Sequence, residues 1–279
     1  RTGGILRTLM KDVTSHYNAV QDYCDKHPGK PTVWATMLYG SQNYGLSSDS
    51  SDVDTKTMLL PSLQMVLMDK GRISTELTMA DGSLDTCKDL REMFGNYLKG
   101  NINFVETLFT PYYEVNFEYA GFFEQLRHKR TLIANAQPVR LMHMTAGMAR
   151  QKHIAFNKPF EGKKEILDKY GYDPKQLHHL VRLYHFMSIF AETIDFYQAL
   201  YCAHPMHNPE LHDYLMDIKV GLLDFEDAVR LNREYMEKID GIVEYADEHM
   251  PTDNGYEEAK KFLDSLIMKV LTQHLRNSL

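Results

Sequence analysis

Two aspartates separated by one residue stand out as candidate ligands for a metal ion. Asp52 and Asp54 open an apolar stretch that runs to Leu60, so the pattern predicts a strand beginning at Asp52. Because successive strand residues point to opposite faces, both aspartates would project from one side while Val53 points into the core. Two carboxylates held that close repel each other, and a hard cation removes the repulsion. Mg²⁺ is usually bound by one or two carboxylates together with waters and substrate phosphates.

A phosphate-binding turn is predicted just before these aspartates. The apolar run over residues 33–39 is typical of a buried strand, and it breaks at Gly40 and Ser41. A glycine at the end of a strand lets the backbone come close to a ligand, and the following N–H groups with the Ser41 hydroxyl would form an anion site. Glycine, serine and aspartate are also common turn residues, so a plain polar loop is the alternative interpretation of this stretch alone.

The combined pattern resembles the signature of the DNA polymerase β nucleotidyltransferase superfamily. Its fuller form, Gly-Ser-x-x-x-Gly followed by Ser-Asp-x-Asp, is matched by Gly40, Ser41, Gly45, Ser51, Asp52 and Asp54. The resemblance implies transfer of a nucleotidyl group from a nucleoside triphosphate (NTP), with ATP as the first candidate. It also implies two Mg²⁺ ions, or Mn²⁺ in their place, about 3.5–4 Å apart.

Nucleotidyl transfer of this type uses a third carboxylate, commonly on a neighbouring strand. Asp85 begins a short strand-like piece that runs into a helix over residues 89–98. Its surroundings resemble the Asp-x-x-Lys-Asp-hydrophobic-Arg pattern of one branch of the superfamily, although the spacing is less regular. We therefore expect Asp85 to ligate metal with Asp52 and Asp54. Glu76 is the alternative ligand, and a turn or N-cap role is the alternative for Asp85.

Glu106 lies in a second segment that resembles the same branch, Gly-Asn-x-Asn-hydrophobic-x-Glu-x-Leu-Phe. Its neighbours are apolar, and an unpaired charge there would be costly. We expect Glu106 to have a structural partner, in a salt bridge or a cap, rather than a catalytic role.

Residues 170–183 form the other informative stretch. Asp173-Pro174 is typical of a helix start, and Lys175, His179 and Arg182 then recur at helical spacing. On spacing alone, a solvated basic face with His179 packed inward is the simpler interpretation. However, the string resembles the Gly-Tyr-Asp-x-Lys-x-x-x-His-x-x-Arg-Leu signature of the predicted RNA-repair-associated nucleotidyltransferases. The residues expected to bind nucleotide are Gly40, Ser41, Lys158, Lys163, Lys175, His179 and Arg182.

Composition limits the partners. The chain has 279 residues, 43% of them hydrophobic, and a net charge of −7, so nucleic acid could be held only by a local basic patch. Residues 140–185 contain nine Lys/Arg against four Asp/Glu. No apolar run approaches the about 20 residues that span a bilayer, so no membrane partner is expected. Three widely spaced cysteines favour a reducing compartment, the cytoplasm, or the host cytoplasm for a viral protein.

The periodicity predicts an α+β fold in two lobes. Residues 1–118 would form a polymerase-β-like catalytic domain with a mixed sheet and helices, including a strand pair over residues 63–68 and 73–79. Residues 119–279 would form an all-α helical bundle, with a helix over residues 174–201 among its long amphipathic segments. The oligomeric state is not indicated.

The predicted activity is Mg²⁺-dependent transfer of a nucleoside monophosphate from an NTP to a hydroxyl or phosphate, with release of pyrophosphate. An RNA end is the first candidate acceptor, and a protein side chain or a small molecule are the others. The alternative from another class is a catalytically inactive module that binds NTP or RNA. Intact Asp52 and Asp54 weigh against it, because a pure binder has no need of adjacent bare carboxylates.

Overall fold

The chain folds into two compact units. The computed structural model describes residues 2–48, 51–68, 71–158 and 162–277, with side chains from residue 8 onward. Unit 1 comprises Arg1–Asn43, Ser47–Ala136 and Gly255–Leu279, and unit 2 comprises Tyr44–Leu46 and Gln137–Asn254. The chain therefore leaves unit 1 twice, once for a three-residue segment and once for a long helical one.

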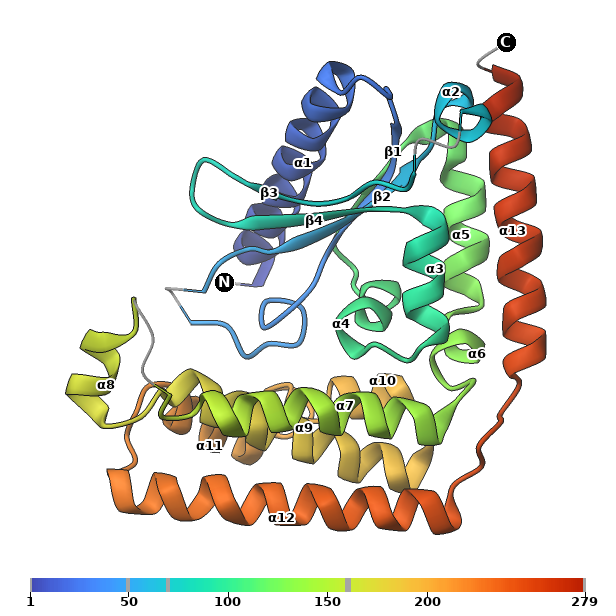
Figure 1. The fold of residues 1–279 in the computed structure, drawn as a ribbon. Helices are drawn as coiled ribbons and strands as arrows, with labels where there is room; N and C mark the ends of the chain where they lie inside the picture. Colours follow the sequence, from blue (N-terminus) through green and yellow to red (C-terminus); the bar gives the residue numbers. More distant parts are fainter. Residues whose placement is uncertain (1, 49–50, 69–70, 159–161, 278–279) are drawn as a thin grey trace. The chain divides into compact units, whose positions relative to one another are not determined.

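A five-stranded mixed sheet forms the centre of unit 1, in the order β3-β4-β2-β1-β5 (Figure 1). The strands are β1 (Thr32–Leu38), β2 (Thr55–Leu60), β3 (Ser74–Thr78), β4 (Leu84–Asp89) and β5 (Tyr113–Val115). Only the β2–β4 pair is parallel. Every residue of β2 is buried, as expected for a central strand that is covered on both faces.

Helices cover both faces of this sheet. On one face, α1 (Thr2–Lys26) packs its Val20 and Cys24 against Val33, Leu59 and Cys87 of the strands. The other face carries α3 (Leu90–Leu98), α4 (Ile102–Val105) and the 3₁₀ turn η1 (Glu106–Leu108) (Figure 1). We refer to these as the α1 face and the α3 face.

Helices from the predicted second domain complete unit 1. They are η2 (Phe117–Tyr119), α5 (Ala120–His128), α6 (Arg130–Ala134) and α13 (Tyr256–Asn277). α13 packs on α3, α5 and α6, and Tyr119 Oη lies 2.9 Å from His274 Nδ1. The division between units thus falls after Ala136 and again before Gly255, which differs from the predicted boundary after residue 118. Helical periodicity alone could not say which core each helix joins.

Two local predictions were wrong. Residues 63–67 form a helix, α2 (Leu63–Leu67), and not a strand, because the Ser62 hydroxyl caps it by accepting the Met65 N–H. The partner of the strand at residues 74–78 is β4 instead. The helix predicted over residues 174–201 is interrupted at Ile194, whose φ of 49° is left-handed.

Unit 2 is a helical bundle, as predicted. Its helices are α7 (Pro138–Ala155), α8 (Lys164–Tyr170), α9 (Pro174–Thr193), α10 (Phe196–Leu200), α11 (Pro209–Lys219) and α12 (Phe225–His249). α7, α9 and α12 pack on one another, and α10 and α11 pack on α9. In neither unit do the described residues include a helix with the length and apolar character needed to cross a membrane.

Candidate functional site

The turn after β1 has the open geometry expected of a phosphate site. Gly40 has a φ of 85°, which glycine adopts without strain, and its carbonyl accepts the Asn43 N–H at 2.9 Å. Apart from Gly40 itself and its two chain neighbours, no residue has an atom within 4 Å of the position a Cβ would take there, so a ligand could approach the backbone. Ser41 follows in the turn and is half-buried.

Glu106 supports this turn. Its carboxylate is almost fully buried, and Oε2 accepts the Gly40 N–H at 3.3 Å. The expectation that Glu106 has a partner is confirmed, with the Gly40 N–H group as one partner, whereas the expected salt bridge or cap stays a prediction. Glu106 thereby ties η1 to the end of β1.

The two aspartates lie at the start of β2 with different exposures. β2 begins at Thr55 and not at Asp52, but the Asp54 carbonyl still accepts the Tyr39 N–H at 3.1 Å and extends the ladder. Val53 packs against the α1-face cluster of Leu9, Val13 and Leu38, as the alternation predicts. Asp52 is exposed, and Asp54 is half-buried with Oδ1 accepting the Leu84 N–H at 3.0 Å.

Asp85 does not join these carboxylates. It pairs with Thr55 in the parallel ladder and points toward the α1 face, where its Oδ2 accepts the hydroxyls of Thr55 at 2.6 Å and Thr57 at 2.7 Å. The Cys87 thiol donates to Oδ1 at 3.0 Å. Complete burial raises the pKa of the Asp85 carboxyl, against the effect of these hydrogen bonds. This geometry does not fit the expected role of Asp85 in metal binding, because both of its carboxylate oxygens already accept hydrogen bonds from buried side chains.

The neighbouring row of residues occupies the α3 face. Glu76, Thr86 and Lys56 are paired side by side across β3, β4 and β2. Alternation places this row on the same face as Asp54, two residues before Lys56. Thr86 therefore stands on β4 where a third carboxylate would be needed. Glu76 is on the correct face but exposed, and it lies two strands away from β2.

Lys56 is a site residue that sequence reasoning missed. Its side chain is buried, with Nζ 3.6 Å from the centre of the Tyr39 ring and 4.6 Å from that of Phe104. Burial lowers the pKa of Lys56 to about 8, while the charges of Glu106, Asp85 and Asp54 act in the opposite direction. The signal was present in the sequence, because Asp-x-Asp-x-Lys continues the alternation that relates Asp52 to Asp54.

The residues present fit one divalent cation better than two. Asp52 and Asp54 offer accessible carboxylate oxygens, which is a usual protein contribution to a Mg²⁺ site that also takes water and phosphate ligands. Within the described ranges, no group of three His, Cys, Asp or Glu side chains is arranged to hold a metal ion. The resemblance also implies a second ion, but the Asp85 carboxylate that was expected to hold it points toward the α1 face.

In unit 2, cations gather at the N-terminus of α9. Asp173 caps the helix by accepting the Lys175 N–H at 3.0 Å, and it also forms an ion pair with Lys163. Lys152 of α7, which the sequence did not single out, is half-buried nearby. Its pKa is lowered by burial and by the charges of Lys163, Lys175 and Arg182. Of the predicted nucleotide-binding residues, the structure thus brings together Lys163, Lys175 and Arg182, whereas Lys158 is exposed and enters none of these interactions.

His179 lies one turn beyond Lys175 and is half-buried. Burial holds the pKa of its imidazole well below the usual value, and His178 and Arg182 act in the same direction. His178 is the more buried of the two, and its Nδ1 lies 2.9 Å from the Leu215 carbonyl oxygen. Both rings are therefore expected to be neutral at pH 7, so His179 can offer phosphate a hydrogen bond but no charge.

The signature loop, residues 40–54, contains a segment, Tyr44–Leu46, that belongs to unit 2. The guanidinium of Arg182 lies 4.2 Å from the centre of the Tyr44 ring. His212 Nε2 is 3.1 Å from the Gly45 carbonyl oxygen, and Lys219 Nζ donates to the Leu46 carbonyl at 2.5 Å. Arg182 is buried, and its Nε has no hydrogen-bond partner among the described residues. The guanidinium of Arg182 therefore packs against the Tyr44 ring, a contact that the sequence did not predict.

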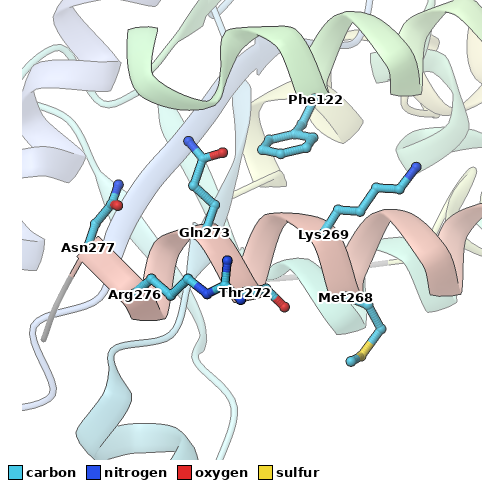
Figure 2. A pocket seen from close by; sticks show the side chains of 7 residues that line it. All are labelled: Phe122, Met268, Lys269, Thr272, Gln273, Arg276 and Asn277. Atoms are coloured by element: carbon cyan, nitrogen blue, oxygen red, sulfur yellow. The ribbon is translucent and has the colours of Figure 1, made fainter.

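A groove elsewhere in unit 1 is not part of this constellation. It lies between α5 and α13 and is lined by Phe122, Met268, Lys269, Thr272, Gln273, Arg276 and Asn277 (Figure 2). None of these residues belongs to the two signature stretches.

Replacing Asp85 tests its structural role. Asp85→Ala leaves three buried donors without their acceptor, so we expect a loss of about 3 kcal/mol in the free energy of unfolding, measured by urea denaturation. The exposed Glu76→Ala is the control and should stay within about 0.5 kcal/mol of the wild type. An Asp85→Ala protein of unchanged stability that no longer binds Mn²⁺ would contradict the assignment.

Replacing Gly45 tests the docking of the loop segment. A Cβ there would lie 2.8 Å from Pro205 Cδ and 2.9 Å from His204 Cδ2, at a φ of 79°. Gly82→Ala is the matched control, because Gly82 has a φ of 91° and open space around it. Gly45→Ala should therefore lose at least about 1 kcal/mol more than Gly82→Ala in thermal or urea unfolding. Equal losses would mean that Gly45 is not packed against residues 204 and 205.

The comparison with known families agrees with both signature stretches. The family model described as the RNA repair pathway DNA polymerase beta family, RlaP, matches residues 17–269. A comparison with curated proteins found no match. The matched range includes the Gly40 turn, both aspartates and the start of α9, and it agrees with the α+β fold, in which a polymerase-β-like sheet is followed by helices. The chain belongs to the RlaP family, the polymerase-β-like proteins of RNA repair.

Proposed function

We propose that the chain transfers a nucleoside monophosphate from an NTP to an acceptor hydroxyl or phosphate, with ATP as the first donor to test. Family membership supports a nucleotidyltransferase-type function in RNA repair. The observation that carries the finer proposal is that two carboxylates, the exposed Asp52 and the half-buried Asp54, come directly before β2, whose partner strand β1 leads into the open Gly40 turn.

The donor side of the reaction is assigned to unit 1. The N–H groups after Gly40 and the Ser41 hydroxyl hold the β- and γ-phosphates, and Glu106 keeps the turn in place through the Gly40 N–H. Asp52 and Asp54 hold a divalent cation, Mg²⁺ or Mn²⁺, which when bound stabilises charge on the attacking and leaving oxygens. The acceptor oxygen bonds to the α-phosphorus, the bond to the bridging oxygen breaks, and pyrophosphate leaves. Positioning supplies much of the remaining acceleration.

The cations of unit 2 are assigned to phosphate binding. Lys152, Lys163 and Lys175 gather around the start of α9, where Asp173 forms an ion pair with Lys163. Such a group attracts a triphosphate or an RNA backbone, and RNA ends are the acceptors that the family description favours. His179 and Lys158 remain candidate contacts.

An inactive NTP- or RNA-binding module is the second candidate. The orientation of Asp85 favours it, because the α3 face then carries Asp54 without a carboxylate on β4. A divalent-independent binder would retain the lysine group of unit 2 and make no use of Asp52 or Asp54.

Label transfer separates these two candidates. The protein is incubated with each α-labelled NTP, Mg²⁺ or Mn²⁺, and RNA, protein and small-molecule acceptors, while pyrophosphate release is followed. Asp52→Ala and Asp54→Ala should each reduce the rate by about 10²-fold or more, because the cation loses a ligand. Lys238→Ala is the control, since Lys238 pairs with Glu234 on the surface of α12. No aspartate-dependent transfer to any acceptor, with NTP binding indifferent to Mg²⁺, would support the inactive module.

Phosphate binding by unit 2 has its own test. Lys152→Ala and Lys175→Ala should each weaken binding of an NTP or a short RNA by about tenfold at low salt, as each removes a cation from a shared group. The slope of log affinity against log salt for RNA should fall by about one in each variant. Lys238→Ala removes the same formal charge from α12 and should leave both quantities unchanged. If all three variants behave alike, net charge explains the binding and the group at α9 does not.

A further inference from the structure

We infer that Lys56 is a built-in cation of the carboxylate site and that the site consequently takes up one divalent ion per chain. The inference rests on the proposed function for its choice of ligand, a divalent ion with an NTP, but it concerns how many ions the protein holds. Nothing in the two signatures assigns a role to Lys56.

The position of Lys56 follows from the ladder. β2 alternates between faces, so Thr55 and Thr57 point toward the α1 face and bond to Asp85, while Lys56 points toward the α3 face. Asp54 lies two residues before Lys56 and therefore faces the same side of the sheet. The ammonium of Lys56 consequently stands over the same side of the sheet as the carboxylate that is proposed to hold the cation.

The charge of Lys56 is fixed in place. The side chain is 5% exposed, and its Nζ is covered by the rings of Tyr39 and Phe104 at 3.6 and 4.6 Å from their centres. A buried ammonium is stable only beside opposite charge or aromatic faces. Here it has both, because the carboxylates of Glu106, Asp85, Asp54 and Glu76 all favour its charged form. Lys56 therefore belongs to the site whether or not a metal ion is bound.

The β4 position beside Lys56, where a second ion would require a carboxylate, is a threonine. Thr86 is the β4 partner of Lys56, and Asp85 beside it points away and is saturated with donors. A second divalent ion would lack that carboxylate ligand. It would also be repelled by the ammonium of Lys56, which is buried between two rings. The carboxylates whose charges act on Lys56 include Glu106, Asp54 and Glu76, and its ammonium offsets part of this negative charge before any ion binds.

Lys56 is thus a positioning residue. It is too covered to contact substrate, but its charge acts on Asp54 and on Glu106, the residue that supports the Gly40 turn. The consequence is a site whose positive charge comes partly from the chain, so the number of bound ions is lower than the resemblance implies.

Counting bound Mn²⁺ tests the inference without requiring any transfer activity. The full chain is titrated with Mn²⁺ in the presence of a saturating non-hydrolysable NTP analogue, and free Mn²⁺ is followed by electron paramagnetic resonance. The expected result is one Mn²⁺ per chain in the complex. Two ions per chain, or none beyond those held by the analogue alone, would overturn the inference.

Two substitutions sharpen this test. Lys56→Met removes the charge and keeps the length of the side chain, so the single Mn²⁺ should bind about tenfold more tightly. The double variant Lys56→Met with Thr86→Asp adds the missing carboxylate and should bind two ions. Lys88→Met is the matched control, because Lys88 lies on the same face but bonds to Ser74 Oγ and pairs with Glu92. Its Mn²⁺ affinity should change less than about twofold.

The outcomes keep this inference separate from the proposed function. Circular dichroism first shows which variants are folded. If Lys56→Met is not folded, the single variant Thr86→Asp is used for the ion count. In that case Thr86→Asp should still bind one ion, since the new carboxylate pairs with Lys56, and binding of two would overturn the inference. A double variant that still binds one ion, or a Lys56→Met protein with unchanged affinity, would also overturn it. One ion without nucleotidyl transfer would leave the inference standing and remove the proposed function, whereas transfer with two ions would do the reverse.

Discussion

The register of the parallel pair β2–β4 is the constraint on which the candidate site depends. It places Thr55 beside Asp85 on the α1 face and Lys56 beside Thr86 on the α3 face. Because side chains alternate with a period of two, a slip of one residue would exchange these pairs and bring Asp85 to Asp54. The hydrogen bonds from Thr55 and Thr57 to Asp85 cross from β2 to β4 and oppose such a slip, since both would be lost. A buried polar cluster on one face thus decides which groups are available on the other.

The site in unit 1 is accordingly asymmetric in charge. One side has the open Gly40 turn, which is held by Glu106, and the other has the two aspartates at the start of β2. Lys56, two residues after Asp54, is covered by the rings of Tyr39 and Phe104. Unit 2 contributes a separate group of lysines at α9, and it also receives Tyr44, Gly45 and Leu46 of the signature loop.

Much of this could be predicted from residue patterns, within physical limits. The β1 run, the Gly40 turn, the inward Val53 and the Asp173 cap depend on neighbours in the chain, and the structure contains all four. The face of Asp85, the division after Ala136 and the packing of Tyr44 under Arg182 depend on contacts between distant segments. Local spacing does not encode the register between two strands. Lys56 is an intermediate case, since its face could be inferred from Asp54 but its burial between two rings could not.

Anomalous diffraction tests the central claim most directly, because it locates the metal on one face of the sheet or the other. Crystals of the chain with a non-hydrolysable NTP analogue and Mn²⁺ should show one anomalous peak, coordinated by Asp52 and Asp54 on the α3 face. The carboxylate of Asp85 should keep its bonds to Thr55 and Thr57. A Mn²⁺ ion coordinated by Asp85, with the β2–β4 register shifted to allow it, would contradict the account.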